Sequence, residues 1–119
     1  MQVSKIKKIV EKTLNQNKAK NIIAINLKGK SSIADYMIIA SGNSSRHIQA
    51  LSEMVVKKLE ENEFGRFTIE GKTSKEWKLI DAIDIIVHIF HPEKRKFYDL
   101  EKMWSDPTNN KEVTIWKIA

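Results

Sequence analysis

Two carboxylates, Asp81 and Asp84, come nearest in this chain to the residues of a catalytic metal site. Neighbouring carboxylates can hold Mg²⁺ for phosphoryl transfer. Only Ala82 and Ile83 separate this pair, at an expected corner between two strands, and the sequence offers neither a third carboxylate beside it nor a phosphate-binding loop. Acidic residues are also common in turns for conformational reasons. A metal-dependent nucleotidyl- or phosphoryl-transferase is therefore an alternative function.

The remaining polar residues do not form a recognisable catalytic or metal-binding pattern. His47, His88 and His91 are too scattered for a zinc site, which needs three or four converging ligands, and we expect His88 to be a partly buried, hydrogen-bonded imidazole. Residues 41–45 could hold an anion at a helix start, but a serine-capped turn explains them equally well. No serine has an identifiable base and acid. We expect no catalytic residue, metal or cofactor, and favour a binding protein over an enzyme.

A surface for a protein partner is the better-supported interpretation. Strand alternation places Trp77, Leu79 and Asp81 on one face of a predicted strand, and Lys78 and Ile80 on the other. A large aromatic side chain, an aliphatic one and a carboxylate together are typical of protein interfaces. The alternative is that Trp77 belongs to the core and Asp81 caps a turn. These residues alone do not decide between the two.

Hydrophobic periodicity and turn residues predict the elements that position this face. Helices are expected over about residues 4–17, from Ser44 or Ser45 to about Asn62, and from Pro92 to a stop at Asp106-Pro107. Apolar or β-branched runs predict strands at 22–27, 36–40, 67–70, 77–82 and 83–90. Residues 113–118 are either an edge strand or a loose tail. This order predicts an α+β fold with a mixed five-stranded sheet flanked by helices.

Length and composition point to one intracellular domain. The 119 residues fit a single domain over 1–119. No apolar run approaches the roughly 20 residues of a membrane span, and the start of the chain lacks the apolar centre of a secretory signal, so we expect no membrane association. The chain has no cysteine, which excludes disulfides and thiolate metal sites. The expected location is the cytoplasm or the interior of an organelle.

The positive charge is concentrated at the amino terminus. The chain carries a formal net charge of +6, yet residues 1–30 hold eight lysines against the single acid Glu11, a balance of +7, so the rest of the chain totals −1. A basic helix within residues 1–20 could contact the phosphates of ribosomal or other RNA. A solvated lysine-rich helix is the commoner explanation of such a pattern. An RNA-binding module is therefore an alternative function.

Several motifs, taken in order, resemble one known family. From about Asn21 to Trp104 the chain is similar to the ribosomal silencing factors of the RsfS/Iojap type. The matching stretches are Ser31-Ser32-Ile33-Ala34-Asp35-Tyr36, Ser41-Gly42-Asn43-Ser44-Ser45-Arg46, Glu70-Gly71, Trp77-Lys78-Leu79-Ile80-Asp81, and Val87-His88-Ile89-Phe90 through Phe97-Tyr98-Asp99-Leu100-Glu101 to Trp104.

The resemblance implies both a fold and a function. The fold would be an α/β/α sandwich related to nucleotidyltransferases, without their catalytic carboxylate set. The function would be binding to ribosomal protein fourteen on the large ribosomal subunit, which sterically blocks joining of the small subunit and represses translation when nutrients are short. Members of the family are found as dimers, so a homodimer is a further alternative. No reaction is required.

The family motif also implies contact residues. Carried over by position, the candidates for the ribosomal contact are Trp77, Lys78, Leu79 and Asp81, followed by Asp84, Arg95 and Tyr98. The family usually has an aromatic residue and then a glycine between the two acids, where this chain has Ala82 and Ile83. Residues 105–119 form a variable tail, without a clear family counterpart from Lys111 onward.

Overall fold

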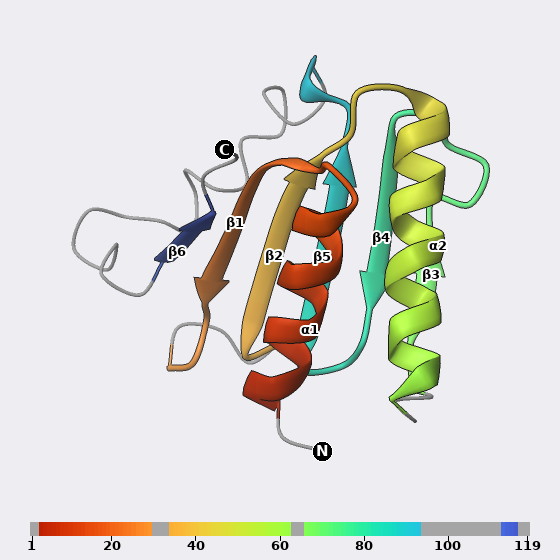
Figure 1. Cartoon of the computed structure of the whole chain (residues 1–119). Helices are drawn as coiled ribbons and strands as arrows, with labels where there is room; N and C mark the ends of the chain where they lie inside the picture. Colours follow the sequence, from red (N-terminus) through yellow and green to blue (C-terminus); the bar gives the residue numbers. More distant parts are fainter. Residues whose placement is uncertain (1–2, 30–33, 63–65, 94–112, 117–119) are drawn as a thin grey trace.

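The structure, a computed structural model, describes residues 3–29, 34–62, 66–93 and 113–116 (Figure 1). Along the chain the elements are α1 (Val3–Gln16), β1 (Lys20–Asn26), β2 (Tyr36–Ser41), α2 (Ser45–Glu61), β3 (Thr68–Glu70), β4 (Trp77–Asp81), β5 (Ile85–Phe90) and β6 (Val113–Trp116). Both predicted helices in this part of the chain and all five predicted strands are confirmed, with ends shifted by one or two residues.

The strands form one mixed sheet in the order β3-β4-β5-β2-β1-β6. Strands β2 and β5 pair in parallel, and the other neighbours pair antiparallel. The mixed α+β sheet is therefore confirmed. Of the two interpretations of the tail, the edge strand is correct for residues 113–116, which pair with β1 and extend the five predicted strands by a sixth.

Helices α1 and α2 pack side by side on the same face of the sheet (Figure 1). Their apolar residues recur at helical spacing, and those that face the sheet are fully or almost fully buried: Ile6, Val10 and Leu14 in α1, and Ile48, Leu51, Val55 and Leu59 in α2. No helix in the described part of the chain is long and apolar enough to cross a membrane. The part of the predicted third helix that follows Glu93 lies outside the described residues.

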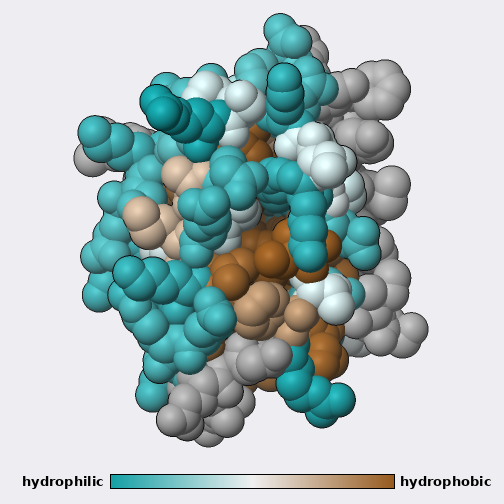
Figure 2. Space-filling view, turned by 90° about the vertical axis from the view of Figure 1, so that its right-hand side faces the viewer, coloured by the Kyte–Doolittle hydropathy of each residue, from teal (hydrophilic) through white to brown (hydrophobic). Residues whose placement is uncertain are grey.

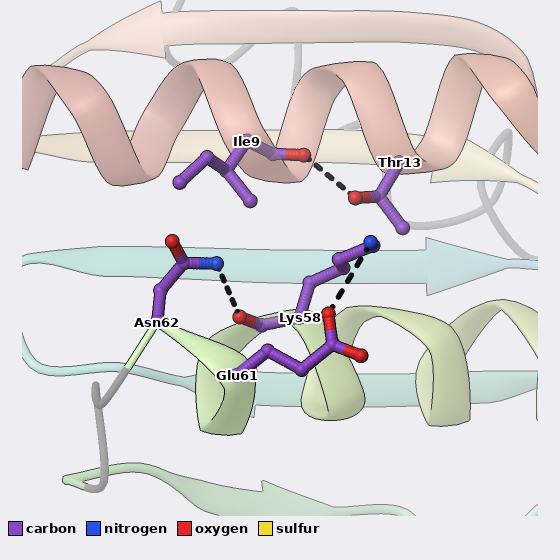
Figure 3. A network of polar contacts seen from close by, with 5 residues as sticks. All are labelled: Ile9, Thr13, Lys58, Glu61 and Asn62. Atoms are coloured by element: carbon purple, nitrogen blue, oxygen red, sulfur yellow. Dashed lines mark hydrogen bonds and ion pairs between the residues drawn. The ribbon is translucent and has the colours of Figure 1, made fainter.

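Local polar contacts define the ends and turns of both helices. Ser44 caps α2 by accepting a hydrogen bond from the His47 backbone N–H at 3.1 Å, as the serine-capped turn predicted. At the other end, the Asn62 side-chain amide donates to the Lys58 carbonyl at 2.8 Å (Figure 3). In α1 the Thr13 hydroxyl donates to the Ile9 carbonyl at 2.7 Å (Figure 3).

Both faces of the sheet carry an apolar layer. The larger cluster lies between the sheet and the two helices. On the opposite face a second cluster contains Ile25, Leu27, Met37, Ile39 and Phe90, with Ile23 and Trp77 packed against it. Because both faces of the sheet are covered by apolar layers, the sequences of β2 and β5 are almost continuously apolar and do not alternate between apolar and polar residues. This second face is where the candidate site begins.

Candidate protein-binding site

Strand β4 presents the predicted interface residues on the face turned away from the helices. Trp77, Leu79 and Asp81 are partly exposed there, whereas Lys78 and Ile80 are buried on the helix side. The alternation expected from the sequence is thus confirmed. Trp77 combines features of both alternatives. Its ring packs against the second apolar cluster, and the residue remains partly exposed. Trp77, Leu79 and Asp81 together form the Trp77 face.

The indole of Trp77 is held by two side chains of the neighbouring strand β5. Its Nε1–H donates to Nδ1 of His88 at 3.4 Å, and its ring stacks on Phe90 with centroids 6.5 Å apart and planes inclined by 27°. His88 and Phe90 are themselves stacked, with centroids 5.5 Å apart. A tryptophan ordered in this way loses little side-chain entropy when a partner covers it, which favours its use as a binding anchor.

His88 is a neutral hydrogen-bond acceptor in this cluster. Burial lowers its pKa from 6.5 to about 4, because the apolar surroundings disfavour the charged imidazolium. An indole N–H can only donate, so Nδ1 of His88 must be unprotonated and Nε2 carries the proton. The expectation of a partly buried, hydrogen-bonded imidazole is confirmed. His88 therefore supports Trp77, and this contact between the two residues was not found by sequence reasoning.

The β3–β4 loop packs closely against Trp77. Gly71 has φ +76°, and a Cβ at this position would lie 2.6 Å from the Trp77 carbonyl oxygen and 2.8 Å from its ring atom Cε3. Only glycine allows both this backbone conformation and this close approach. Farther along the loop, the Ser74 hydroxyl accepts hydrogen bonds from the Glu76 and Trp77 backbone N–H groups, each at 3.2 Å. The loop and the start of β4 are therefore one ordered unit.

Lys78 does not join the Trp77 face. Its side chain lies on the helix side of the sheet, is 3% exposed, and donates through Nζ to the carbonyl oxygens of Gly71 and Lys72, each at 2.8 Å. It also lines a groove of about 460 Å³ between α2 and the β3–β4 hairpin. Figure 2 shows this side of the molecule, where apolar side chains gather between hydrophilic ones. A direct partner contact by Lys78 stays a prediction that this placement does not favour.

Asp81 and Asp84 bracket a tight turn between β4 and β5. The Asp81 carboxylate accepts a hydrogen bond from the Ile83 N–H at 2.9 Å, and the Asp84 N–H donates to the Ala82 carbonyl, also at 2.9 Å. This i to i+2 bond together with φ +71° at Ile83 characterises a γ-turn. The prediction that a strand begins at Ile83 is wrong, since β5 starts at Ile85. The Asp81 carboxylate therefore acts in the turn through its side chain, and Asp84 acts through its backbone.

Ile83 is the unexpected residue of this turn. A β-branched side chain at positive φ is strained, at a cost of about 1–3 kcal/mol, and Ile83 is also 48% exposed. The family pattern offered a signal, because it usually has glycine at this position. Beside the turn lies a hollow of about 330 Å³, lined by Arg66, Phe67, Thr68, Asp81 and Ile83. The turn thus exposes an apolar side chain next to Asp81.

The described residues do not assemble a metal centre. Within the ranges the structure describes, no three His, Cys, Asp or Glu residues are close enough to hold an ion. His47 instead joins the two helices: Nδ1 accepts from the Asn43 N–H, and Nε2 lies 2.9 Å from the Asn17 carbonyl, to which it donates. Nδ1 of His91 accepts from the Glu93 N–H at 3.4 Å. Each histidine therefore has a local structural contact.

The basic amino-terminal helix forms a separate surface. Lys7 pairs with the buried Glu11 at 3.2 Å, and the ammonium groups of Lys7 and Lys28 lie 5.3 and 5.4 Å from the ring centroid of Tyr36. Helix α1 packs on one face of the sheet (Figure 1) and Trp77 packs in the apolar cluster of the other face, so α1 and the Trp77 face lie on opposite sides of the sheet. Two of the predicted contact residues, Arg95 and Tyr98, lie outside the described residues.

Comparison with known proteins connects this arrangement with one family. Residues 2–118 match the family described as "Ribosomal silencing factor during starvation". A relative from Zymomonas mobilis, named ribosomal silencing factor RsfS, is 46% identical over 97 residues, which are 82% of this chain and 73% of the relative. A mouse protein named for mitochondrial assembly of the ribosomal large subunit is 33% identical over 77% of this chain and 42% of its own length.

The fold is also shared with solved structures. A crystal structure of a Chromobacterium violaceum protein superimposes with a TM-score of 0.84 at 36% sequence identity, and the match covers 88% of each chain. The two proteins therefore share the architecture of sheet and helices over most of their length.

Proposed function

Because this chain belongs to the family of ribosomal silencing factors, matched over residues 2–118, we propose that it binds the large ribosomal subunit and sterically blocks joining of the small subunit. The contact on the large subunit is ribosomal protein fourteen, as the sequence resemblance implies. Translation is repressed when nutrients are short. A family named for silencing is a regulatory one, and this mechanism needs affinity and position but no reaction.

The observation that carries the proposal is the ordered Trp77 face. Trp77 is partly exposed, yet its ring is fixed by His88 and Phe90 and closed in by Gly71. Aromatic residues in such settings account for a large part of binding energy at protein interfaces. Leu79, beside it on the same face, adds apolar area that a partner can desolvate. The face is thus preorganised for a protein surface.

The acids of the β4–β5 turn set the charge of the proposed contact. Asp81 is partly exposed at the end of the Trp77 face, and Asp84 follows in the turn. Basic side chains on a ribosomal protein complement these carboxylates, which favours correct orientation and fast association. Arg95 and Tyr98 remain second-rank candidates from the family motif. Lys78, which is buried on the other side of the sheet, acts indirectly.

The mouse relative's name refers to the ribosomal large subunit, which supports the choice of subunit. The proposed compartment is the cytoplasm, because the Zymomonas mobilis relative is a bacterial ribosomal silencing factor and bacterial ribosomes are cytoplasmic. A homodimer that buries Trp77 would compete with the ribosome for the same face. Dimerisation would then weaken silencing.

Co-sedimentation tests the proposal directly. The purified protein is incubated with large subunits, small subunits are then added, and joining is followed on a sucrose gradient. We expect the wild-type protein to sediment with large subunits and to reduce joining, and Trp77→Ala to lose both effects. Met54→Ala is the matched control, because Met54 is a 43% exposed apolar residue on α2, away from the Trp77 face. Wild-type protein that stays at the top of the gradient would refute the function.

A second candidate is RNA binding by the basic amino-terminal helix. It is favoured by the balance of +7 within residues 1–30. Contacts with phosphates release counterions, so this mode predicts a steep loss of affinity for protein-free ribosomal RNA as salt rises. Neutralising Lys5, Lys8 and Lys12 should abolish such binding while leaving the Trp77 face unchanged. Binding to large subunits that survives this change would assign the main contact to the Trp77 face.

A further inference from the structure

Lys78 is a buried cation whose contacts are backbone carbonyls. Only 3% of the residue is exposed, and Nζ donates to the Gly71 and Lys72 carbonyl oxygens at 2.8 Å each. Within the described part of the chain, no carboxylate lies within 4 Å of this ammonium group. Burying a charge is costly unless hydrogen bonds compensate it. The ammonium group therefore binds the loop tightly, because the loop supplies its described acceptors.

The same loop touches the indole of Trp77. The Gly71 carbonyl that accepts from Lys78 belongs to the residue whose Cα packs against the Trp77 ring, where an added Cβ would lie 2.8 Å from Cε3. The Gly71 carbonyl also accepts from the Ser74 N–H at 3.0 Å, which closes the turn. A continuous set of contacts thus runs from Lys78 on the helix side of the sheet, through the loop, to Trp77.

We propose that Lys78 is a positioning residue for Trp77. It holds the loop from Gly71 to Glu76 against the indole, and so keeps Trp77 in the orientation that the partner binds. The inference rests on the proposed function for its effect on the ribosome, but the positioning itself is a property of the free protein. A residue that is 3% exposed on the opposite side of the sheet from Trp77 acts through the loop and not by touching the partner.

The test measures the Trp77 indole and the partner affinity in the same variants. Lys78→Met keeps most of the side-chain volume and removes the ammonium group. Lys72→Met is the matched control, because Lys72 lines the same groove and its side chain carries the same charge, while its backbone carbonyl is the group that bonds Lys78. The full-length protein is labelled with ¹⁵N, and the Trp77 indole resonance is assigned among three tryptophans by Trp77→Phe.

We expect Lys78→Met to move the Trp77 indole resonance in the free protein and to weaken binding to large subunits about five- to tenfold, which is part of the roughly thirtyfold loss expected when the aromatic anchor is removed altogether. Lys72→Met should change neither. Lys78→Arg, which restores a cationic donor, should return the resonance toward its wild-type position. An unmoved indole resonance in a folded Lys78→Met variant would overturn the inference, and weaker binding in that case would mark Lys78 as a direct contact.

Gly71→Ala tests the same set of contacts from the loop side. Its Cβ must push the loop away from Trp77, because it would lie 2.6 Å from the Trp77 carbonyl oxygen. We expect the indole resonance to move although Lys78 is intact, and a wild-type resonance would contradict the proposal. If Lys78→Met does not fold, a wild-type resonance in Gly71→Ala would still contradict the proposal. If wild-type protein does not bind large subunits, the proposed function fails, while the indole resonance still decides the role of Lys78.

Discussion

Trp77 on β4 and His88 on β5 are joined by a hydrogen bond from the indole Nε1–H to imidazole Nδ1, 3.4 Å long. The two residues lie on the same face of neighbouring antiparallel strands, where Leu79 pairs with His88 and Trp77 with Phe90. The bond is therefore diagonal across the ladder, within reach of large aromatic side chains. It ties the proposed anchor of the interface to a buried residue of the sheet.

Truncation of the anchor should cost much of the affinity. We expect Trp77→Ala to weaken binding to large subunits by about 2 kcal/mol or more, roughly thirtyfold, which is typical of a central interface tryptophan. Trp77→Phe keeps an aromatic ring but loses the hydrogen bond to His88. Its loss of affinity should therefore be smaller than that of Trp77→Ala. Equilibrium sedimentation at a fixed salt concentration measures both. Equal affinities for wild type and Trp77→Ala would remove Trp77 from the interface.

The buried imidazole should make folding stability depend on pH. The pKa of His88 is about 4 in the folded protein and 6.5 for an unperturbed histidine in the unfolded chain, so between these pH values the unfolded state binds more protons. Its contribution is fully present above pH 6.5 and is lost as the pH falls toward 4. We expect about 2 kcal/mol of stability to disappear between pH 7.5 and pH 5 on this account.

Urea unfolding at several pH values checks this expectation. Carboxylates also titrate in the acid range, so the informative quantity is the difference between wild type and His88→Leu, which lacks the titrating group. The difference should shrink as the pH falls. Parallel stability curves for the two proteins would show that His88 is not the group responsible.

Glycine at the strained turn should stabilise the protein. Ile83→Gly removes the cost of φ +71° for a β-branched residue, and Ile83 is 48% exposed, so little buried apolar area is lost. Glycine also gives the unfolded chain more conformational entropy, which lowers the stability of the folded protein by about 0.5–1 kcal/mol. We expect a net gain of about 1 kcal/mol in the free energy of unfolding. Ile83→Ala keeps a Cβ at positive φ and should gain much less.

The two roles of Asp81 can be separated by a pair of variants. Asp81→Asn keeps an oxygen that can accept from the Ile83 N–H at the turn but removes the charge. We expect it to fold with nearly unchanged stability and to bind large subunits several-fold more weakly at low salt, with the difference fading as salt rises. Asp81→Ala should lose stability as well, by about 1 kcal/mol. A difference in affinity between wild type and Asp81→Asn that does not change with salt would argue against a charged contact.

Much of the candidate site was predictable from local pattern. The placement of Trp77, Leu79 and Asp81 on one face follows from the two-residue period of a strand, and it is confirmed. The buried state of His88 and the Ser44 cap were also expected and confirmed. The untested candidates Arg95 and Tyr98 rest on the family motif alone.

The sequence by itself determined the elements, the face that each strand residue occupies, and the family, because these depend on short-range periodicity and on ordered motifs. Only the tertiary structure decided which residues meet. Strand register brought His88 to Trp77, the hairpin carried the Gly71 and Lys72 carbonyls to Lys78, and the turn imposed positive φ on Ile83. Such contacts join residues from different segments, and no local pattern encodes the register that brings them together.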